Sequence, residues 1–184
     1  MILACQNIEK SFDGVTLLHD ASFHIEEREK AALVGINGAG KSTLFRMIVG
    51  ELTPDDGQVI LSKGKTLGYL AQHQELSSQL IIYDSLLQVK QHILDMENRM
   101  RDMELQMKHT TGDELTKLME AYSRLTHEFE LENGYAYKSE LIGVLKGLGF
   151  SEEDFEKPVA TLSGGQKTRV ALGRLLLSKP DIIL

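Results

Sequence analysis

A glycine-rich loop in the first quarter of the chain carries the clearest chemistry. It matches the phosphate-binding loop pattern, with Gly35 and Gly40 followed by Lys41 and Ser42. Glycines let backbone N–H groups converge on phosphate oxygens, a lysine here reaches the β and γ phosphates, and the hydroxyl holds magnesium. We therefore expect a site for a nucleoside triphosphate with Mg²⁺, and we regard a chance glycine loop as the weaker alternative. The residues expected to contact the nucleotide are Gly35, Asn37, Gly38, Ala39, Gly40, Lys41, Ser42 and Thr43.

A second motif lies near the C-terminal end and consists of Leu162, Ser163, Gly164, Gly165 and Gln166. Taken alone, it predicts a capped helix start with a flexible entry, because serine is a preferred N-cap residue. We expect this helix to begin near Ser163 and to end before Pro180, and we expect an earlier helix over 139–148.

The phosphate loop requires a strand before it and a helix after it. The apolar run over residues 29–35 ends in glycine, which predicts a buried strand that enters a turn. Apolar residues at helical spacing predict a helix over 41–49, and Gly50 stands where a glycine ends a helix.

Further strands are predicted around this core. Two turn clusters bracket short strands over 58–61 and 66–70. We expect them to form a small antiparallel meander that pairs with residues 2–8. Residues 181–184 predict the start of one more strand.

The middle of the sequence predicts a helical hairpin. From Leu86 to Leu131 there is no proline, and the only glycine is Gly112. Two sets of apolar residues recur at steps of three and four: Ile93, Met96, Met100, Met103 and Met107, then Leu115, Leu118, Tyr122, Leu125 and Phe129. Thr111 and Glu114 are spaced as a capping box for the second helix. We interpret the stripes as the seam of the hairpin, with a partner-binding face as the alternative.

Composition is that of a globular domain of 184 residues, with 42% hydrophobic and 26% charged residues. The net charge of −7 argues against a broad electrostatic grip on nucleic acid or anionic lipid. No apolar run approaches the roughly 18 residues of a membrane span. A single cysteine cannot form an internal disulfide, so we expect a cytoplasmic protein.

The two motifs together resemble those of the ATP-binding cassette (ABC) family. The resemblance implies an α/β fold of the P-loop NTPase type, with an antiparallel β layer and a helical subdomain, that binds ATP and Mg²⁺. In that family the signature motif, here Ser163–Gln166, contacts ATP held by a second nucleotide-binding domain. The resemblance also places Phe12 against adenine, although a core phenylalanine is an equal alternative. It places Gln72 at magnesium and the attacking water, so that Lys41 and Gln72 would be catalytic and Ser42 and Gln72 would hold the metal.

The hairpin narrows the resemblance to the ABC-F subfamily, whose soluble twin-cassette members carry a helical arm in the first cassette. The segments Asn133–Tyr135, 145–150 and 162–172 look typical of that group. The resemblance implies that 1–184 is part of one nucleotide-binding domain. Within it we expect a phosphate-loop core and β layer at 1–84, the arm at 85–134, and the rest of the helical subdomain with the signature helix at 135–184.

The ABC-F resemblance implies an ATPase that acts on the ribosome in translation regulation or antibiotic resistance, through rRNA, tRNA or a ribosomal protein. One alternative is the ATP-binding subunit of an ABC membrane transporter, which would need a separate permease. Another is a nucleotide-dependent interaction module without turnover.

Charge and missing residues refine this expectation. Between Gln91 and Glu140 there are six Lys or Arg and eleven Asp or Glu, a balance of −5. Because phosphate contacts are made chiefly by Lys and Arg, an acidic arm favours a ribosomal protein, or contacts by local basic residues alone. In the family the catalytic carboxylates and a switch histidine follow the strand at 181–184, so we expect these 184 residues to be catalytically incomplete.

Overall fold

The computed structural model describes residues 1–71 and 79–184. They form two compact units, one of Met1–Tyr69 with Pro180–Leu184 and the other of Leu70–Lys179. Among the described residues, no helix combines the length and apolar character that a membrane span needs.

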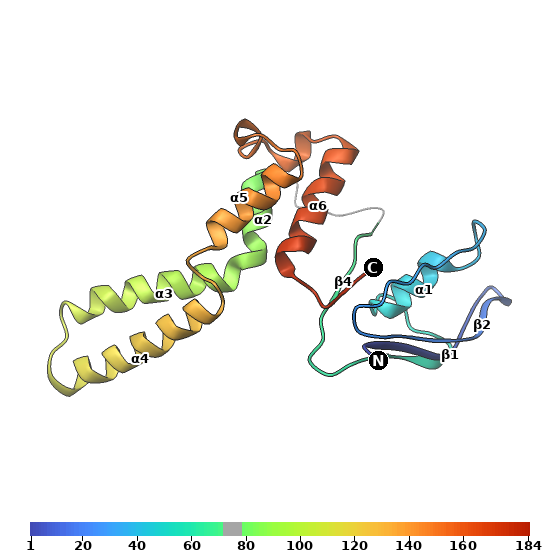
Figure 1. Ribbon diagram of the computed structural model, residues 1–184, viewed down its shortest axis with the longest axis horizontal. Helices are drawn as coiled ribbons and strands as arrows, with labels where there is room; N and C mark the ends of the chain where they lie inside the picture. Colours follow the sequence, from blue (N-terminus) through green and yellow to red (C-terminus); the bar gives the residue numbers. More distant parts are fainter. Residues whose placement is uncertain (72–78) are drawn as a thin grey trace. The chain divides into compact units, whose positions relative to one another are not determined.

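The first unit is built on a three-stranded antiparallel sheet (Figure 1). Strand β1 (Leu3–Phe12) lies between β2 (Val15–Ile25) and β3 (Asp56–Leu61). Asp13 and Gly14 join β1 to β2 with φ angles of 49° and 78°. Positive φ at both central residues is the geometry of a tight hairpin turn whose twist matches that of its strands. The predicted pairing of the N-terminal segment with the strand near residue 58 is confirmed.

Helix α1 (Lys41–Ile48) packs its apolar face on this sheet. The shared core consists of Ile2, Leu3, Cys5, Ile8, Leu44, Met47 and Ile48. Gly50 follows the helix at φ 80°, its N–H donates to the carbonyl of Met47, and that of Glu51 donates to the carbonyl of Arg46. These bonds satisfy carbonyls that the last helical turn leaves free, so the predicted glycine stop is confirmed.

The predicted strand over 29–35 is wrong. These residues form no regular element, and Leu33 and Val34 are 43% and 89% exposed. A continuous apolar run becomes a buried strand only when strands pair with it and both faces are covered. Among the described residues, β4 (Leu67–Gly68) pairs in parallel with β5 (Ile182–Ile183), and 29–35 has no strand partner. The strand near residue 66 therefore lies outside the antiparallel meander that we predicted.

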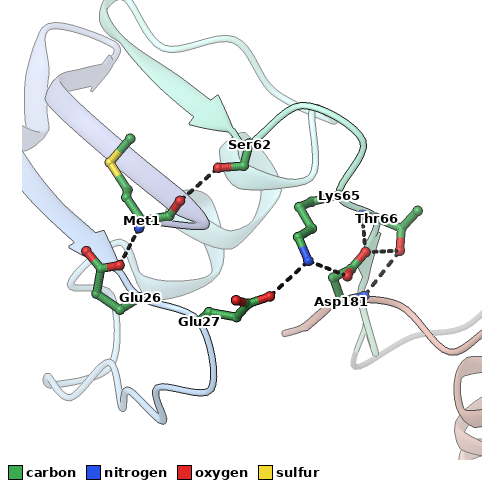
Figure 2. Close-up of polar contacts among 7 residues, drawn as sticks. All are labelled: Met1, Glu26, Glu27, Ser62, Lys65, Thr66 and Asp181. Atoms are coloured by element: carbon green, nitrogen blue, oxygen red, sulfur yellow. Dashed lines mark hydrogen bonds and ion pairs between the residues drawn. The ribbon is translucent and has the colours of Figure 1, made fainter.

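Hydrogen bonds of Asp181 link the start of β5 to the segment before β4 (Figure 2). Its carboxylate accepts hydrogen bonds from the backbone N–H of Thr66 at 2.9 Å and from the Thr66 hydroxyl at 3.0 Å. Lys65 Nζ donates to the same carboxylate at 3.0 Å and to Glu27 at 3.0 Å. The backbone N–H of Thr66 and the Lys65 ammonium lower the pKa of Asp181 to about 2. Charge and hydrogen bonding thus favour the ionised form.

The hydrogen bonds of Asp181 are expected to make the stability of the fold depend on pH. Because the pKa is lowered from 3.8 to about 2, the ionised carboxylate stabilises the fold at neutral pH and stops doing so as pH falls from about 4 to 2. Asp181→Asn should therefore lower the midpoint of urea unfolding at pH 7, and its difference from wild type should shrink over that window. A difference that is the same at pH 2.5 and pH 7 would contradict this role.

The second unit is helical (Figure 1). Its core is shared by α2 (Ile82–Leu87), α5 (Tyr137–Gly147) and α6 (Gly164–Ser178). The short 3₁₀ turns η2 (Glu152–Asp154) and η3 (Val159–Thr161) lie between α5 and α6, and η1 (Gln88–Lys90) follows α2 directly. The predicted helices over 139–148 and from Ser163 to Pro180 are confirmed.

Helices α3 (Gln91–Met107) and α4 (Gly112–Leu131) lie side by side as an antiparallel hairpin (Figure 1). Their seam buries Ile93, Met100, Leu125 and Phe129, with Met96, Met103 and Tyr122 packed against it. The methionine stripe is therefore mainly the seam of the hairpin, as predicted. The Tyr122 hydroxyl donates across the seam to Glu104 at 2.7 Å. The capping box at Thr111 is wrong, because Thr111 is the N-cap of α4 but makes no side-chain cap bond.

Candidate nucleotide-binding site

The phosphate loop takes its shape from glycines. Gly38 and Gly40 have φ angles of 85° and 90°, which side-chain-bearing residues rarely adopt. A Cβ at Gly40 would lie 3.1 Å from Leu17 and 3.2 Å from Leu18, so the loop packs closely on β2. The pattern of glycines is therefore required by both conformation and packing.

The N-terminus of α1 is left open to an anion. Gly40 is its N-cap, no side chain of residues 1–71 or 79–184 caps the helix, and its first turn holds no acidic residue. The unpaired N–H groups and the helix dipole together favour a bound phosphate. Ser42 is exposed and Thr43 half-buried in this turn, so both hydroxyls lie on the helix end where the phosphates are expected. These residues fit Mg²⁺ and a triphosphate, with Ser42 as the expected magnesium ligand.

Lys41 lies folded over the loop. Its Nζ donates to the carbonyl oxygens of Gly35 and Ile36, each at 2.7 Å. The ammonium is thus held by two backbone carbonyls near the helix N-terminus. Because an ammonium has three donors and phosphate is a charged acceptor, these contacts can be exchanged for phosphate oxygens.

Phe12 ends β1 with a ring that is 47% exposed, so it is not a core phenylalanine. Lys10 Nζ lies 5.5 Å from the ring centroid. The same ammonium donates to Asp55 at 2.5 Å and to the Thr53 carbonyl at 3.0 Å. The Lys10 hydrogen bond lowers the pKa of Asp55. An exposed aromatic with a fixed cation beneath it could stack on a base.

The signature motif forms the first turn of α6. The backbone N–H of Gln166 donates to Ser163 Oγ at 3.3 Å, and the backbone N–H of Ser163 donates to Gln166 Oε1 at 2.9 Å. This reciprocal capping box holds the turn in place. Within the part of the chain that the structure describes, no atom would lie within 4 Å of a Cβ at Gly164 or Gly165. The glycines therefore keep the helix end accessible. Gln72 lies outside the described residues.

Removing the N-cap side chain of α6 should lower the stability of the protein measurably. Ser163→Ala is expected to lower the free energy of unfolding by about 1 kcal/mol, because it removes an acceptor for the first helical turn. Thr111→Ala is the matched control, since Thr111 occupies the N-cap of α4 without such a bond. Urea unfolding of both variants measures the effect, and equal losses would count against the capping role.

A profile of the family described as ABC transporter matches residues 18–184. The chain belongs to this family. An ABC nucleotide-binding domain is a mixed α/β fold with antiparallel strands, in agreement with the predicted fold class. A solved structure described as the ATP-binding subunit of an ABC transporter has the same fold, with a TM-score of 0.68 and 19% identity, over 100% of this chain and 65% of that one.

Curated relatives place the chain near the ABC-F group. "Putative ATP-binding protein YdiF" of Bacillus subtilis is 46% identical over 184 residues, which are 100% of this chain and 29% of that protein. "ABC transporter F family member 5" of Arabidopsis thaliana is 30% identical over 97% of this chain and 26% of its own length. "Energy-dependent translational throttle protein EttA" of Mycobacterium tuberculosis is 31% identical over 100% of this chain and 32% of its own length. The chain thus spans 26–32% of the length of these ABC relatives.

Two residues near the expected base position were not predicted from the sequence. Lys10 and Asp55 are 45 positions apart, and only the antiparallel pairing of β1 with β3 brings them together. The available signal was weak: a lysine near the end of β1, followed two residues later by an aromatic.

Proposed function

We propose that this chain is the ATP-binding part of an ABC-F protein that acts on the ribosome during translation. The observation that carries the proposal is the α3–α4 hairpin, which lies between the phosphate loop and the signature helix. Support comes from relatives that align along nearly the whole chain, one of which is described as a translational throttle protein. This function places the protein in the cytoplasm.

ATP binding rests on the α1 end of the first unit. The backbone N–H groups at Gly38–Ser42 and the Lys41 ammonium neutralise phosphate charge. Ser42 and Gln72 would hold Mg²⁺, which would supply positive charge to offset that of the phosphates. Ser163 and Gly165 act on the nucleotide of a second domain.

Hydrolysis is proposed for the full-length protein. No histidine in the chain matches the switch position of the family, and none of its residues matches the water-activating glutamate. Residues 1–184 alone are therefore proposed to bind ATP without turnover. An ATPase rate from these residues that disappears in Lys41→Ala would refute this part of the proposal.

The hairpin is proposed as the element that contacts the ribosome. Its excess of Asp and Glu favours a basic ribosomal protein over RNA phosphate. Part of its charge is already paired, since Glu97 accepts a hydrogen bond from Arg101 at 2.8 Å and from the Tyr137 hydroxyl at 2.8 Å. Lys138 lies 3.8 Å from the same carboxylate.

Co-sedimentation with ribosomes tests the proposal. The full-length protein would carry Gln in place of the catalytic glutamate that the family has beyond Leu184, so that the ATP-bound state persists. We expect retention on ribosomes with ATP and loss with ADP. Equal sedimentation with both nucleotides, or none with either, would refute an ATP-dependent ribosomal function.

A further inference from the structure

The exposed ring of Phe12 contacts the ammonium of a buried lysine, Lys10. Lys10 is 9% exposed, and its Nζ lies 5.5 Å from the ring centroid, within the range of a cation–π contact. Single exposed aromatics are common on protein surfaces and need no function. A buried ammonium is different, because desolvation penalises the charge unless partners hold it in place.

Asp55 holds the Lys10 ammonium in place and is itself fixed by the backbone of β1. Its Oδ1 accepts from Lys10 Nζ at 2.5 Å, and its Oδ2 accepts from the backbone N–H of Ser11 at 2.8 Å. The Thr53 carbonyl accepts from the same ammonium at 3.0 Å. The register of β1 with β2 shifts between Lys10 and Ser11, and the Lys10 ammonium contacts the Phe12 ring across this irregularity. The cation and the ring are therefore fixed relative to each other.

The hairpin register connects this ring to the phosphate loop. Phe12 pairs with Val15, and Lys10 pairs with Leu18. Gly40 of the phosphate loop packs against Leu17 and Leu18. The ring thus lies two to three residues along β2 from the loop contact, or roughly 7–10 Å at about 3.3 Å per residue. A nucleotide whose phosphates occupy the loop can extend its base toward this ring.

We propose that Lys10 is a positioning residue for the nucleotide base. Its ammonium fixes the Phe12 ring and draws electron density from it, so that the opposite face stacks more strongly on an electron-rich purine. Asp55 keeps the ammonium in place. This inference rests on the proposed ATP binding and on Phe12 as the surface that meets the base.

Calorimetric titration with two ligands separates the base from the phosphates. MgATP offers both, whereas inorganic tripolyphosphate with Mg²⁺ offers only the phosphates. Phe12→Ala should weaken ATP about tenfold, the order of one base–aromatic stack, and leave tripolyphosphate unchanged. Lys10→Met keeps the apolar stem and should weaken ATP about threefold, also without an effect on tripolyphosphate. In the Phe12→Ala background, Lys10→Met should have no further effect on ATP affinity. With Phe12 present, Lys10→Arg should keep most of the wild-type affinity, because guanidinium also pairs with aromatic faces.

The contradicting results are distinct. If Lys10→Met weakens both ligands equally, or weakens ATP as much without Phe12 as with it, the lysine is structural and the inference is wrong. If wild-type protein binds both ligands equally, the phosphate site stands but the base surface does not. If it binds neither, the proposed ATP binding itself fails. Should Lys10→Met unfold, Asp55→Asn loosens the same ammonium, and an unchanged ATP affinity in that variant would overturn the inference.

Discussion

Lys41→Ala is expected to weaken MgATP binding by about 10- to 100-fold. Hydrogen bonds to charged groups contribute about 1.5–3 kcal/mol, and about 1.4 kcal/mol corresponds to a tenfold change in affinity. In the structure the ammonium is held by the carbonyls of Gly35 and Ile36, each at 2.7 Å. Alanine removes the one side-chain cation that the loop places beside the open end of α1, while the glycine conformation that shapes the backbone is kept.

Calorimetric titration with MgATP measures the change. Lys63→Ala is the matched control, since Lys63 lies in the turn between β3 and β4 and the overall charge changes by the same amount. The control should bind ATP as wild type does. An unchanged affinity in Lys41→Ala would show that the loop is not the phosphate site.

Gly134→Ala is expected to destabilise the root of the hairpin by about 1–3 kcal/mol, the usual cost of inserting a group into a packed core. A Cβ at Gly134 would lie 2.5 Å from three carbons of the Phe129 ring. The ring cannot retreat easily, because it is 3% exposed and makes an edge contact with Tyr135 at 5.0 Å between centroids. The backbone N–H of Gly134 also donates to the Phe129 carbonyl at 2.8 Å, which fixes the close approach.

Gly143→Ala provides the control for Gly134→Ala. Gly143 lies within α5, and no described atom would lie within 4 Å of its added Cβ. There alanine should be neutral or stabilising by up to about 1 kcal/mol, because it is the better helix former. Urea unfolding followed by circular dichroism compares the two. If Gly134→Ala costs no more than Gly143→Ala, the ring contact does not determine stability at this position.

The helices could be predicted because their signal is local. Apolar residues at steps of three and four identified both helices of the hairpin. Gly50 indicated the end of α1 because glycine readily adopts the positive φ that ends a helix, and the structure gives it that φ. The capping box at Thr111 failed although its spacing was correct, since spacing does not fix the side-chain rotamer. At Ser163 the same kind of spacing did produce the reciprocal bonds.

Strand pairing was harder to predict because it depends on residues far apart in sequence. The run over 29–35 has a strand composition, yet the parallel pair forms between β4 and β5, which Asp181 fastens through Thr66. Strand β2 was not predicted at all, although the Asp13-Gly14 pair is a strong hairpin signal. The phosphate-loop pattern is local, since Gly35, Gly40, Lys41 and Ser42 lie within eight positions, whereas the contact between Lys10 and Asp55 required the sheet register.

We propose that the ATP-bound ABC-F protein contacts the ribosome through its α3–α4 hairpin. The most direct measurement is ribosome co-sedimentation in ATP of the full-length protein, with residues 91–132 intact or replaced by a short turn. MgATP affinity is measured in parallel, because the phosphate loop lies in the other compact unit and should be unaffected. We predict that the replacement abolishes ribosome retention while ATP affinity stays within twofold of wild type. Undiminished retention without the hairpin would contradict the account.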